Sequence, residues 1–186
     1  MHIPDKISKW IRAKNWTLHE HQIRMFKSSE CSSQLLIAPT GSGKTLAGFL
    51  PTIADLYLNP SQKLHTLYIS PLKALASDIK RNLETPIEEL ELKISVEDRT
   101  GDTKQSIKKK QRVIPPNILL TTPESLALLM SYPEAPSIFS SLKRIIVDEI
   151  HAITESKRGD QLFLAISNIR KYCLDAKIIG LSATVN

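Results

Sequence analysis

The sequence predicts an α/β fold, built on a doubly wound and mainly parallel sheet with helices on both faces. Short β-branched or apolar runs alternate with longer amphipathic stretches along most of the chain. A short apolar run bounded by Pro, Gly, Ser or Thr is typical of a strand that is buried on both faces of a parallel sheet. The regular alternation of such runs with helical patterns favours right-handed crossovers between parallel strands.

Six strands and four long helices are expected, with two helix starts marked by capping signals. The expected strands are residues 34–38, 66–70, 92–96, 118–121, 144–147 and 177–181, and the expected helices are 43–58, 72–90, 123–131 and 159–172. Thr17 and Glu20 predict a capping box that opens a further helix, which carries Gln22. Thr122 and Pro123 supply an N-cap and a first-turn proline for the helix at 123.

Composition limits the classes of protein that remain. With 186 residues, 41% of them apolar, the chain suits one globular domain with a single core. The formal charge of +6 fits either a solvated basic surface or the binding of a polyanion. Cys31 and Cys173 lie too far apart in sequence to form a metal or redox motif, so we expect reduced, packed thiols. The chain has no signal-peptide pattern and no apolar run of about 20 residues, which excludes a membrane span.

The segment 104–112 holds five basic residues in nine. A solvated helix face is the simplest interpretation, and a nucleic-acid contact is the alternative.

A glycine-rich loop between the first expected strand and its helix predicts phosphate binding. Residues 38–45 read Ala-Pro-Thr-Gly-Ser-Gly-Lys-Thr, with Ala38 in place of the glycine that opens the strict pattern. The glycines allow successive N–H groups to turn inward as an anion nest at a helix N-terminus. Lys44 is expected to reach the β- and γ-phosphates, and the Thr45 hydroxyl to bind Mg²⁺. The predicted nucleotide-binding residues here are Pro39, Thr40, Gly41, Ser42, Gly43, Lys44 and Thr45.

Two carboxylates follow the strand expected at 144–147. Open α/β sheets bind ligands at the carboxyl ends of their strands, which is where Asp148 and Glu149 lie. Asp148 is expected to hold Mg²⁺, and Glu149 to orient and deprotonate the water that attacks the γ-phosphorus. Together with Lys44, these acids predict a catalytic NTP-hydrolysing site of the P-loop class, which binds a nucleoside triphosphate with Mg²⁺.

The ordered motifs resemble those of the DExH-box helicases of superfamily 2, over nearly the whole chain. Residues 148–151 resemble motif II, 182–184 motif III, 70–75 motif Ia and 121–126 motif Ib. Segments 99–103 and 156–160 are similar to the large helicase-related group, and within it to bacterial DExH helicases associated with a DNA ligase in damage response. The resemblance implies a RecA-like P-loop NTPase domain.

The resemblance also implies that ATP is the nucleotide cofactor, and it assigns roles around the nucleotide. It implies that Gln22 reads adenine, through an amide that can both donate and accept hydrogen bonds. Trp16 would stack on the base, although a buried core tryptophan remains an open alternative. His151, Ser182 and Thr184 would couple the γ-phosphate to the nucleic-acid groove. His21 is a weaker candidate for contact with adenine.

A groove for a single nucleic-acid strand is implied as well. Lys73 and Arg99 offer charge, while the Thr122 hydroxyl and helix-start N–H groups suit phosphate oxygens. Ordinary capping or packing is the alternative for each residue taken alone. The implied contacts are Pro71, Lys73, Arg99, Gly101, Thr122 and Pro123.

The expected organisation is an N-terminal segment 1–30, which carries the adenine-recognition glutamine, followed by the first RecA-like domain at 31–186. The family's second RecA-like lobe, with its arginine fingers, would follow motif III, so we expect this chain to be part of a longer protein. The resemblance implies a 3′-to-5′ translocase on single-stranded DNA, acting in repair with a DNA ligase and a nuclease in the bacterial cytoplasm, near the nucleoid.

Other functions stay open from the sequence. One alternative is an RNA-remodelling ATPase, because contacts to the backbone need not distinguish the two sugars. Another is a non-catalytic nucleic-acid-binding module, which the intact set Lys44, Thr45, Asp148 and Glu149 disfavours. A P-loop kinase or GTPase fits Gln22 and residues 182–184 poorly.

Overall fold

The sheet is six-stranded and parallel throughout, in a computed structural model that describes residues 2–154 and 157–183. The strand order is β1-β6-β5-β2-β4-β3, which confirms the predicted doubly wound parallel architecture. The strands are β1 (Gln34–Ile37), β2 (Thr66–Ile69), β3 (Val96–Arg99), β4 (Ile118–Thr121), β5 (Arg144–Val147) and β6 (Lys177–Ser182).

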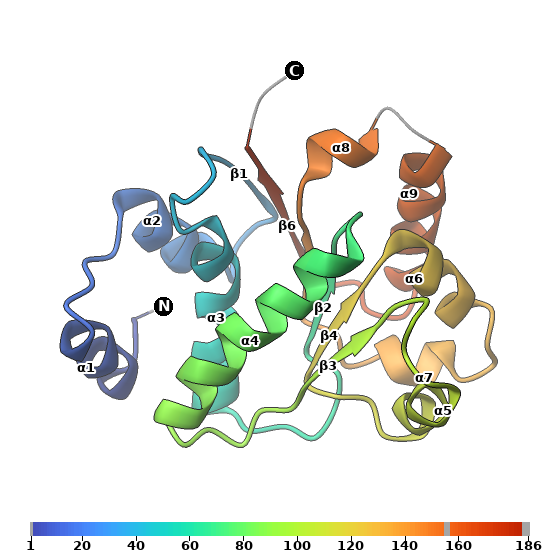
Figure 1. Cartoon of the computed structure of the whole chain (residues 1–186), viewed down its shortest axis with the longest axis horizontal. Coiled ribbons are helices and arrows are strands. Elements are labelled where there is room, and N and C mark those ends of the chain that lie inside the picture. Colours follow the sequence, from blue (N-terminus) through green and yellow to red (C-terminus); the bar gives the residue numbers. More distant parts are fainter. Residues whose placement is uncertain (1, 155–156, 184–186) are drawn as a thin grey trace.

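Helices cover both faces of the sheet (Figure 1). One core cluster joins α1 (Asp5–Ala13), α2 (Glu20–Ser28), α3 (Lys44–Leu58) and α4 (Lys73–Glu89) to one face. A second cluster joins α6 (Pro123–Met130), α7 (Ala135–Phe139) and α9 (Lys157–Ile169) to the other. Tyr68 and Ile146 belong to the first cluster, while Leu67 and Ile145 belong to the second. This alternation follows from the two-residue period of a strand.

The strand expected at residues 92–96 is misplaced, because the ladder with β4 begins only where Val96 pairs with Ile118. Leu92 ends the preceding helical turn, where its N–H bonds to the Ile87 carbonyl, and its side chain packs against the first core cluster. The apolar run therefore leads into the sheet. The more polar sequence Val-Glu-Asp-Arg forms the edge strand β3 instead.

The start of α2 also differs from the prediction. His19 is the N-cap, and its N–H donates to Gln22 Oε1 at 2.8 Å in a reciprocal capping box. The box predicted from Thr17 and Glu20 is therefore wrong by two residues. The Thr122 cap is confirmed, since its hydroxyl accepts the Ser125 N–H at the start of α6.

The basic segment forms α5 (Gln105–Val113), and only part of it is solvated. Lys108 is buried and donates to the Gly101 carbonyl at 3.1 Å. Lys110 and Arg112 pair with Glu97 and Glu134. Two of the five charges thus form surface ion pairs, and a third stabilises a turn. Within the described ranges, no helix is both long and apolar enough to cross a membrane.

Candidate nucleotide site and nucleic-acid groove

The loop after β1 has the backbone that an anion nest requires. Gly41 and Gly43 have φ angles of +79° and +78°, in the left-handed region that favours glycine. Gly43 is the N-cap of α3, so the loop leads into the positive end of a 15-residue helix. A Cβ on Gly43 would lie 2.5 Å from Gln22 Nε2, so a larger residue there would displace the Gln22 amide.

The lysine of the loop is held at the centre of that nest. Lys44 is buried, and its Nζ donates to the carbonyls of Ala38 at 2.6 Å and Pro39 at 3.0 Å. The buried Ser42 hydroxyl has no hydrogen-bond partner among the described residues. A cationic amine and an unsatisfied hydroxyl beside a helix N-terminus together suit the phosphates of a nucleotide.

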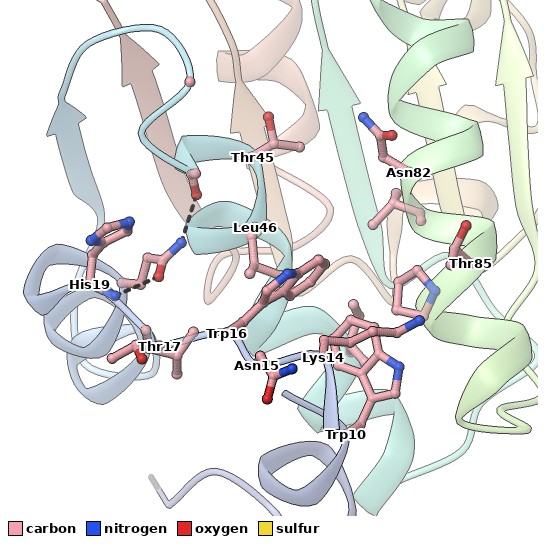
Figure 2. A pocket seen from close by; sticks show the side chains of 17 residues that line it. Trp10, Lys14, Asn15, Trp16, Thr17, His19, Thr45, Leu46, Asn82 and Thr85 are labelled. Atoms are coloured by element: carbon pink, nitrogen blue, oxygen red, sulfur yellow. Dashed lines mark hydrogen bonds between the residues drawn. The ribbon is translucent and has the colours of Figure 1, made fainter. Parts of the chain in front are cut away.

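Gln22 is fixed by both ends of its amide. Its Oε1 accepts the His19 N–H, and its Nε2 donates to the Gly43 carbonyl at 3.1 Å, as the dashed lines in Figure 2 mark. One N–H and further lone pairs remain for a ligand. His21 contacts the loop itself, with Nε2 3.1 Å from the Ser42 carbonyl. Gln22 therefore ties α2 to the phosphate loop.

A cavity of about 710 Å³ opens beside the loop and is lined by Trp16, Gln22, Gly43 and Thr45. Figure 2 shows Trp16 near Leu46 of α3, with Asn82 and Thr85 of α4 across the opening. Trp16 is 51% exposed, so the alternative of a buried core tryptophan is wrong. Asp148 and Glu149 do not line this cavity, whose mixed aromatic, aliphatic and polar lining suits a base and ribose.

A second tryptophan holds the first in place. The Trp10 ring meets Trp16 edge-on, with centroids 5.4 Å apart. Glu89 of α4 accepts hydrogen bonds from Lys14 Nζ at 2.7 Å and Trp10 Nε1 at 2.6 Å. These hydrogen bonds hold the pKa of Glu89 below its ordinary value, first through Lys14 and then through Trp10. No sequence pattern predicted this contact between α1 and α4.

The two acids follow β5 at the same edge of the sheet as the phosphate loop. Only β6 separates β1 from β5, which places the two strands roughly 10 Å apart. Asp148 is buried, with Oδ1 accepting the Glu149 N–H at 2.8 Å and Oδ2 accepting the Tyr68 hydroxyl at 2.7 Å. Burial raises the pKa of Tyr68, and the Asp148 charge raises it further, so the hydroxyl remains a donor.

Glu149 adopts a backbone conformation that is uncommon for a side chain with a Cβ. Its φ angle is +49°, in the left-handed region. A residue in this conformation is strained and persists only where the surrounding structure stabilises it. Such residues are concentrated at functional sites. Glu149 occupies the turn between β5 and α8 (Ile150–Thr154), where its carboxylate lies beside His151.

The predicted coupling residues are connected to this acid and to the phosphate loop. His151 Nδ1 lies 3.0 Å from Ser182 Oγ and 3.4 Å from Glu149 Oε2. The Ser182 carbonyl accepts the Ala38 N–H at 3.1 Å, where the phosphate loop begins. Figure 1 shows α8 beside the end of β6. Thr184, the third predicted coupling residue, lies outside the described residues.

The proposed metal ligands suit Mg²⁺. Asp148 and Thr45 supply hard oxygen donors, and Mg²⁺ commonly takes only one or two carboxylates together with substrate phosphates. Residues 2–154 and 157–183 contain no group of three or more His, Cys, Asp or Glu that would hold a metal alone. Nucleotide phosphates and water commonly supply the other ligands of Mg²⁺ in such sites.

On the groove side, the structure corrects one prediction outright. Arg99 is 1% exposed, and its Nη1 donates to the Lys108 carbonyl at 3.0 Å and Gln111 Oε1 at 3.2 Å. The prediction that Arg99 contacts a nucleic-acid strand is therefore wrong. Packing turns the guanidinium inward, where it fixes α5 to β3 and faces the Tyr132 ring.

The other groove candidates divide into buried and accessible residues. Thr122 and Pro123 are buried, with the Thr122 hydroxyl engaged in the α6 cap, so neither side chain is offered to a strand. Lys73 and Gly101 are exposed, and Pro71 is partly exposed. Lys73 Nζ lies 3.0 Å from Asp102 Oδ1, which joins the start of α4 to the turn after β3.

Sequence reasoning missed Tyr68, which holds Asp148, and the pair Trp10 and Glu89, which hold Trp16. A hydroxyl-bearing tyrosine within the apolar run at 66–70 was the only available sign of the first. Nothing in the sequence linked α1 to α4.

The sheet is parallel, a phosphate nest follows β1 and a pair of acids follows β5. These features together define a P-loop nucleotide-binding domain. The DEAD/DEAH box helicase family model matches residues 19–186. The chain belongs to the DEAD/DEAH box helicase family. This confirms the resemblance to superfamily 2 helicases.

Similar proteins include helicases that are much longer than this chain. It is 38% identical to "ATP-dependent helicase Lhr-Core protein 2" of Thermococcus barophilus, matching 99% of this chain but 23% of that protein. It is 44% identical to "Lhr helicase/ probable uracil glycosylase" of Mycolicibacterium smegmatis, over 84% of this chain and 11% of that protein. The structure of Mycobacterium smegmatis helicase Lhr bound to ssDNA and AMP-PNP matches 98% of this chain and 25% of that one, with a TM-score of 0.91 and 37% identity.

Proposed function

We propose that this chain is the ATP-binding lobe of an ATP-dependent helicase, which couples ATP hydrolysis to movement along single-stranded DNA. The observation that carries the proposal is the connected series from Glu149 through His151 and Ser182 to the phosphate loop at Ala38. This series links Glu149, which would act on the γ-phosphate, to Ser182 at the end of β6 and to the start of the phosphate loop after β1. A simple nucleotide-binding domain has no need of that link.

Each part of the site has a distinct role in this proposal. Lys44 and the loop N–H groups neutralise the phosphates, and Trp16 and Gln22 hold the adenine. Thr45 and Asp148 hold Mg²⁺, which when bound neutralises charge on the phosphates. Glu149 orients the attacking water and accepts its proton.

The nucleic-acid side rests on the accessible residues Pro71, Lys73 and Gly101, which share the same sheet edge. DNA is favoured because the similar Lhr and MrfA helicases have been solved with DNA bound, at 37% and 29% identity. The longer relatives support a second RecA-like lobe in the complete protein, which would supply arginine fingers. Movement 3′-to-5′, a role in DNA repair, a cytoplasmic, nucleoid-associated location and partnership with a ligase or nuclease are further parts of the proposal.

The central test compares Glu149→Gln and Lys44→Ala with the unaltered complete protein. Glu149→Gln is expected to retain nucleotide binding and to lose hydrolysis roughly 10²-fold or more, because the amide cannot accept the water's proton. Lys44→Ala is expected to lose nucleotide binding itself. Normal turnover by Glu149→Gln would show that Glu149 is not the base and would overturn the assigned mechanism.

The strand specificity needs a separate measurement. ATPase rates of the complete protein are compared with oligodeoxythymidylate and oligouridylate of equal length. Greater stimulation by the DNA strand is expected. Greater stimulation by the RNA strand would contradict the DNA preference and would make RNA the proposed substrate.

A further inference from the structure

We propose that Tyr68 and Ser70 form a relay, in which Tyr68 positions the metal carboxylate Asp148 and Ser70 connects it to the strand-binding segment at 71–73. This inference rests on the proposed function, since it assigns a second coupling route to the same site. It is separate from the route through His151 and Ser182, which runs toward β6 and β1.

The relay begins at a buried hydrogen bond between neighbouring strands. Tyr68 is fully buried in β2, and its hydroxyl donates to Asp148 Oδ2 at 2.7 Å. The Asp148 N–H donates to the Ile69 carbonyl at 2.9 Å, which fixes the same carboxylate from its backbone. A residue that orients a metal ligand in this way contributes strongly to metal affinity, although it never touches the metal.

The relay continues along β2 toward its end. Ser70 is fully buried directly after β2, and it follows Ile69, whose carbonyl accepts the Asp148 N–H. The Leu72 N–H lies 3.4 Å from Ser70 Oγ. Pro71 and Lys73, the accessible groove residues, flank Leu72 in sequence. A shift of this segment would therefore move Ser70 and the adjoining end of β2, where Tyr68 and the Ile69 carbonyl hold Asp148.

The end of β2 is also tied across the sheet. The Ser70 N–H donates to the Thr121 carbonyl at 3.0 Å, and the Thr121 hydroxyl donates to the Arg99 carbonyl at 2.8 Å. Gly101 follows two residues later, at the turn that Lys73 contacts through Asp102. Strand β2 thus lies between the acid of β5 and the groove segments of β4 and β3, so it is placed to transmit strand binding to the metal site.

Two variants separate the halves of the relay in the complete protein. Tyr68→Phe keeps the ring that packs 5.4 Å from Phe49 and removes only the hydroxyl. Ser70→Ala keeps the bond between Tyr68 and Asp148 and removes the link to Leu72. Tyr172→Phe is the matched control, because Tyr172 follows α9 near the start of β6, at the opposite edge of the sheet.

The first measurement is binding of a fluorescent ATP analogue, in EDTA and across a Mg²⁺ titration. Tyr68→Phe is expected to bind as tightly as the unaltered protein in EDTA, but to need roughly tenfold more Mg²⁺ for the metal-dependent gain in affinity. Ser70→Ala and Tyr172→Phe are expected to keep the ordinary Mg²⁺ requirement. An unchanged requirement in Tyr68→Phe, or an equal loss of binding in EDTA, would overturn the positioning role.

The second measurement is the ratio of strand-stimulated to basal ATPase at saturating Mg²⁺. Ser70→Ala is expected to lower this ratio roughly threefold, as changes along a coupling route do. An unchanged ratio would overturn the connection to the groove. If the unaltered protein shows no stimulation by either DNA or RNA, the proposed function fails, while the Mg²⁺ titration still decides the role of Tyr68.

Discussion

The proposed nucleotide-binding residues and the proposed nucleic-acid-binding residues form two halves of the site, the nucleotide half and the groove half. The two halves differ in whether backbone or side chains make the expected contacts. In the nucleotide half, the proposed contacts come from backbone conformation and from residues that follow strand ends, such as Gly43 and Asp148. In the groove half, binding was expected from long side chains such as Lys73 and Arg99. Packing buries Arg99 and leaves Lys73 exposed. Motifs made from backbone can be read from sequence, whereas the direction of a long charged side chain cannot.

The strongest test of this comparison is whether the nucleotide half hydrolyses ATP efficiently by itself. The 186-residue chain alone is expected to hydrolyse ATP ~10³-fold or more slowly than the complete protein, because arginine fingers from a second lobe are worth that much in rate. It should bind nucleotide weakly in the presence of Mg²⁺ and unwind no duplex. The check is a steady-state ATPase assay of both proteins with single-stranded DNA, and rapid DNA-stimulated turnover by the chain alone would contradict it.

Arg99 and Lys73 test the groove half directly. Arg99→Leu is expected to lower the free energy of unfolding by roughly 3 kcal/mol, because Gln111 and the Lys108 carbonyl lose a buried charged donor. Lys73→Ala is expected to leave the unfolding midpoint nearly unchanged and to weaken strand binding a few-fold, with less salt dependence. Urea denaturation and fluorescence anisotropy measure the two effects. The assignment fails if Arg99→Leu is fully stable and loses strand affinity alone.

Trp16 sharpens the comparison inside the nucleotide half, since it is an exposed side chain. Trp16→Ala is expected to weaken binding of an ATP analogue about tenfold, through loss of stacking worth roughly 1 kcal/mol or more. Trp16→Phe should restore most of the affinity. Leu174→Ala, another exposed apolar residue, serves as the control. Equal affinities for all four proteins would show that Trp16 does not contact the base.

The smallest expected effect lies at the opposite edge of the sheet, away from both halves. Burial raises the pKa of Asp55, but the His65 ring, whose Nε2 lies 3.6 Å from Asp55 Oδ2, and the charge of Arg144 outweigh it, so the pKa is lowered overall. The stabilisation is therefore present above the ordinary carboxyl pKa and is lost as the pH falls through the lowered folded value. Asp55→Asn should be less stable at pH 7 and lose less stability on acidification. Urea titrations between pH 7 and 3 measure this, and parallel curves for both proteins would contradict it.

Most of the fold followed from patterning, with exceptions at β3 and at the start of α2. The buried strands β2, β4 and β5 were predicted within one residue, because a strand covered on both faces has an uninterrupted apolar sequence. The edge strand β3 was not, because an edge strand needs fewer apolar residues, and the apolar run at 92–96 serves the helix exit instead. The start of α2 was also misplaced, because the N-cap was predicted at Thr17 and lies at His19.

By itself, the sequence determined the parallel α/β fold, the phosphate loop at 38–45 and the acids at 148 and 149. Each depends on local backbone chemistry and on the rule that parallel strands share a carboxyl edge. Only the tertiary structure decided that Arg99 is buried, that Trp16 is held by Trp10 and Glu89, and that Tyr68 reaches Asp148. Those contacts join residues up to 80 positions apart, and their geometry is set by how strands and helices pack, which no local pattern encodes.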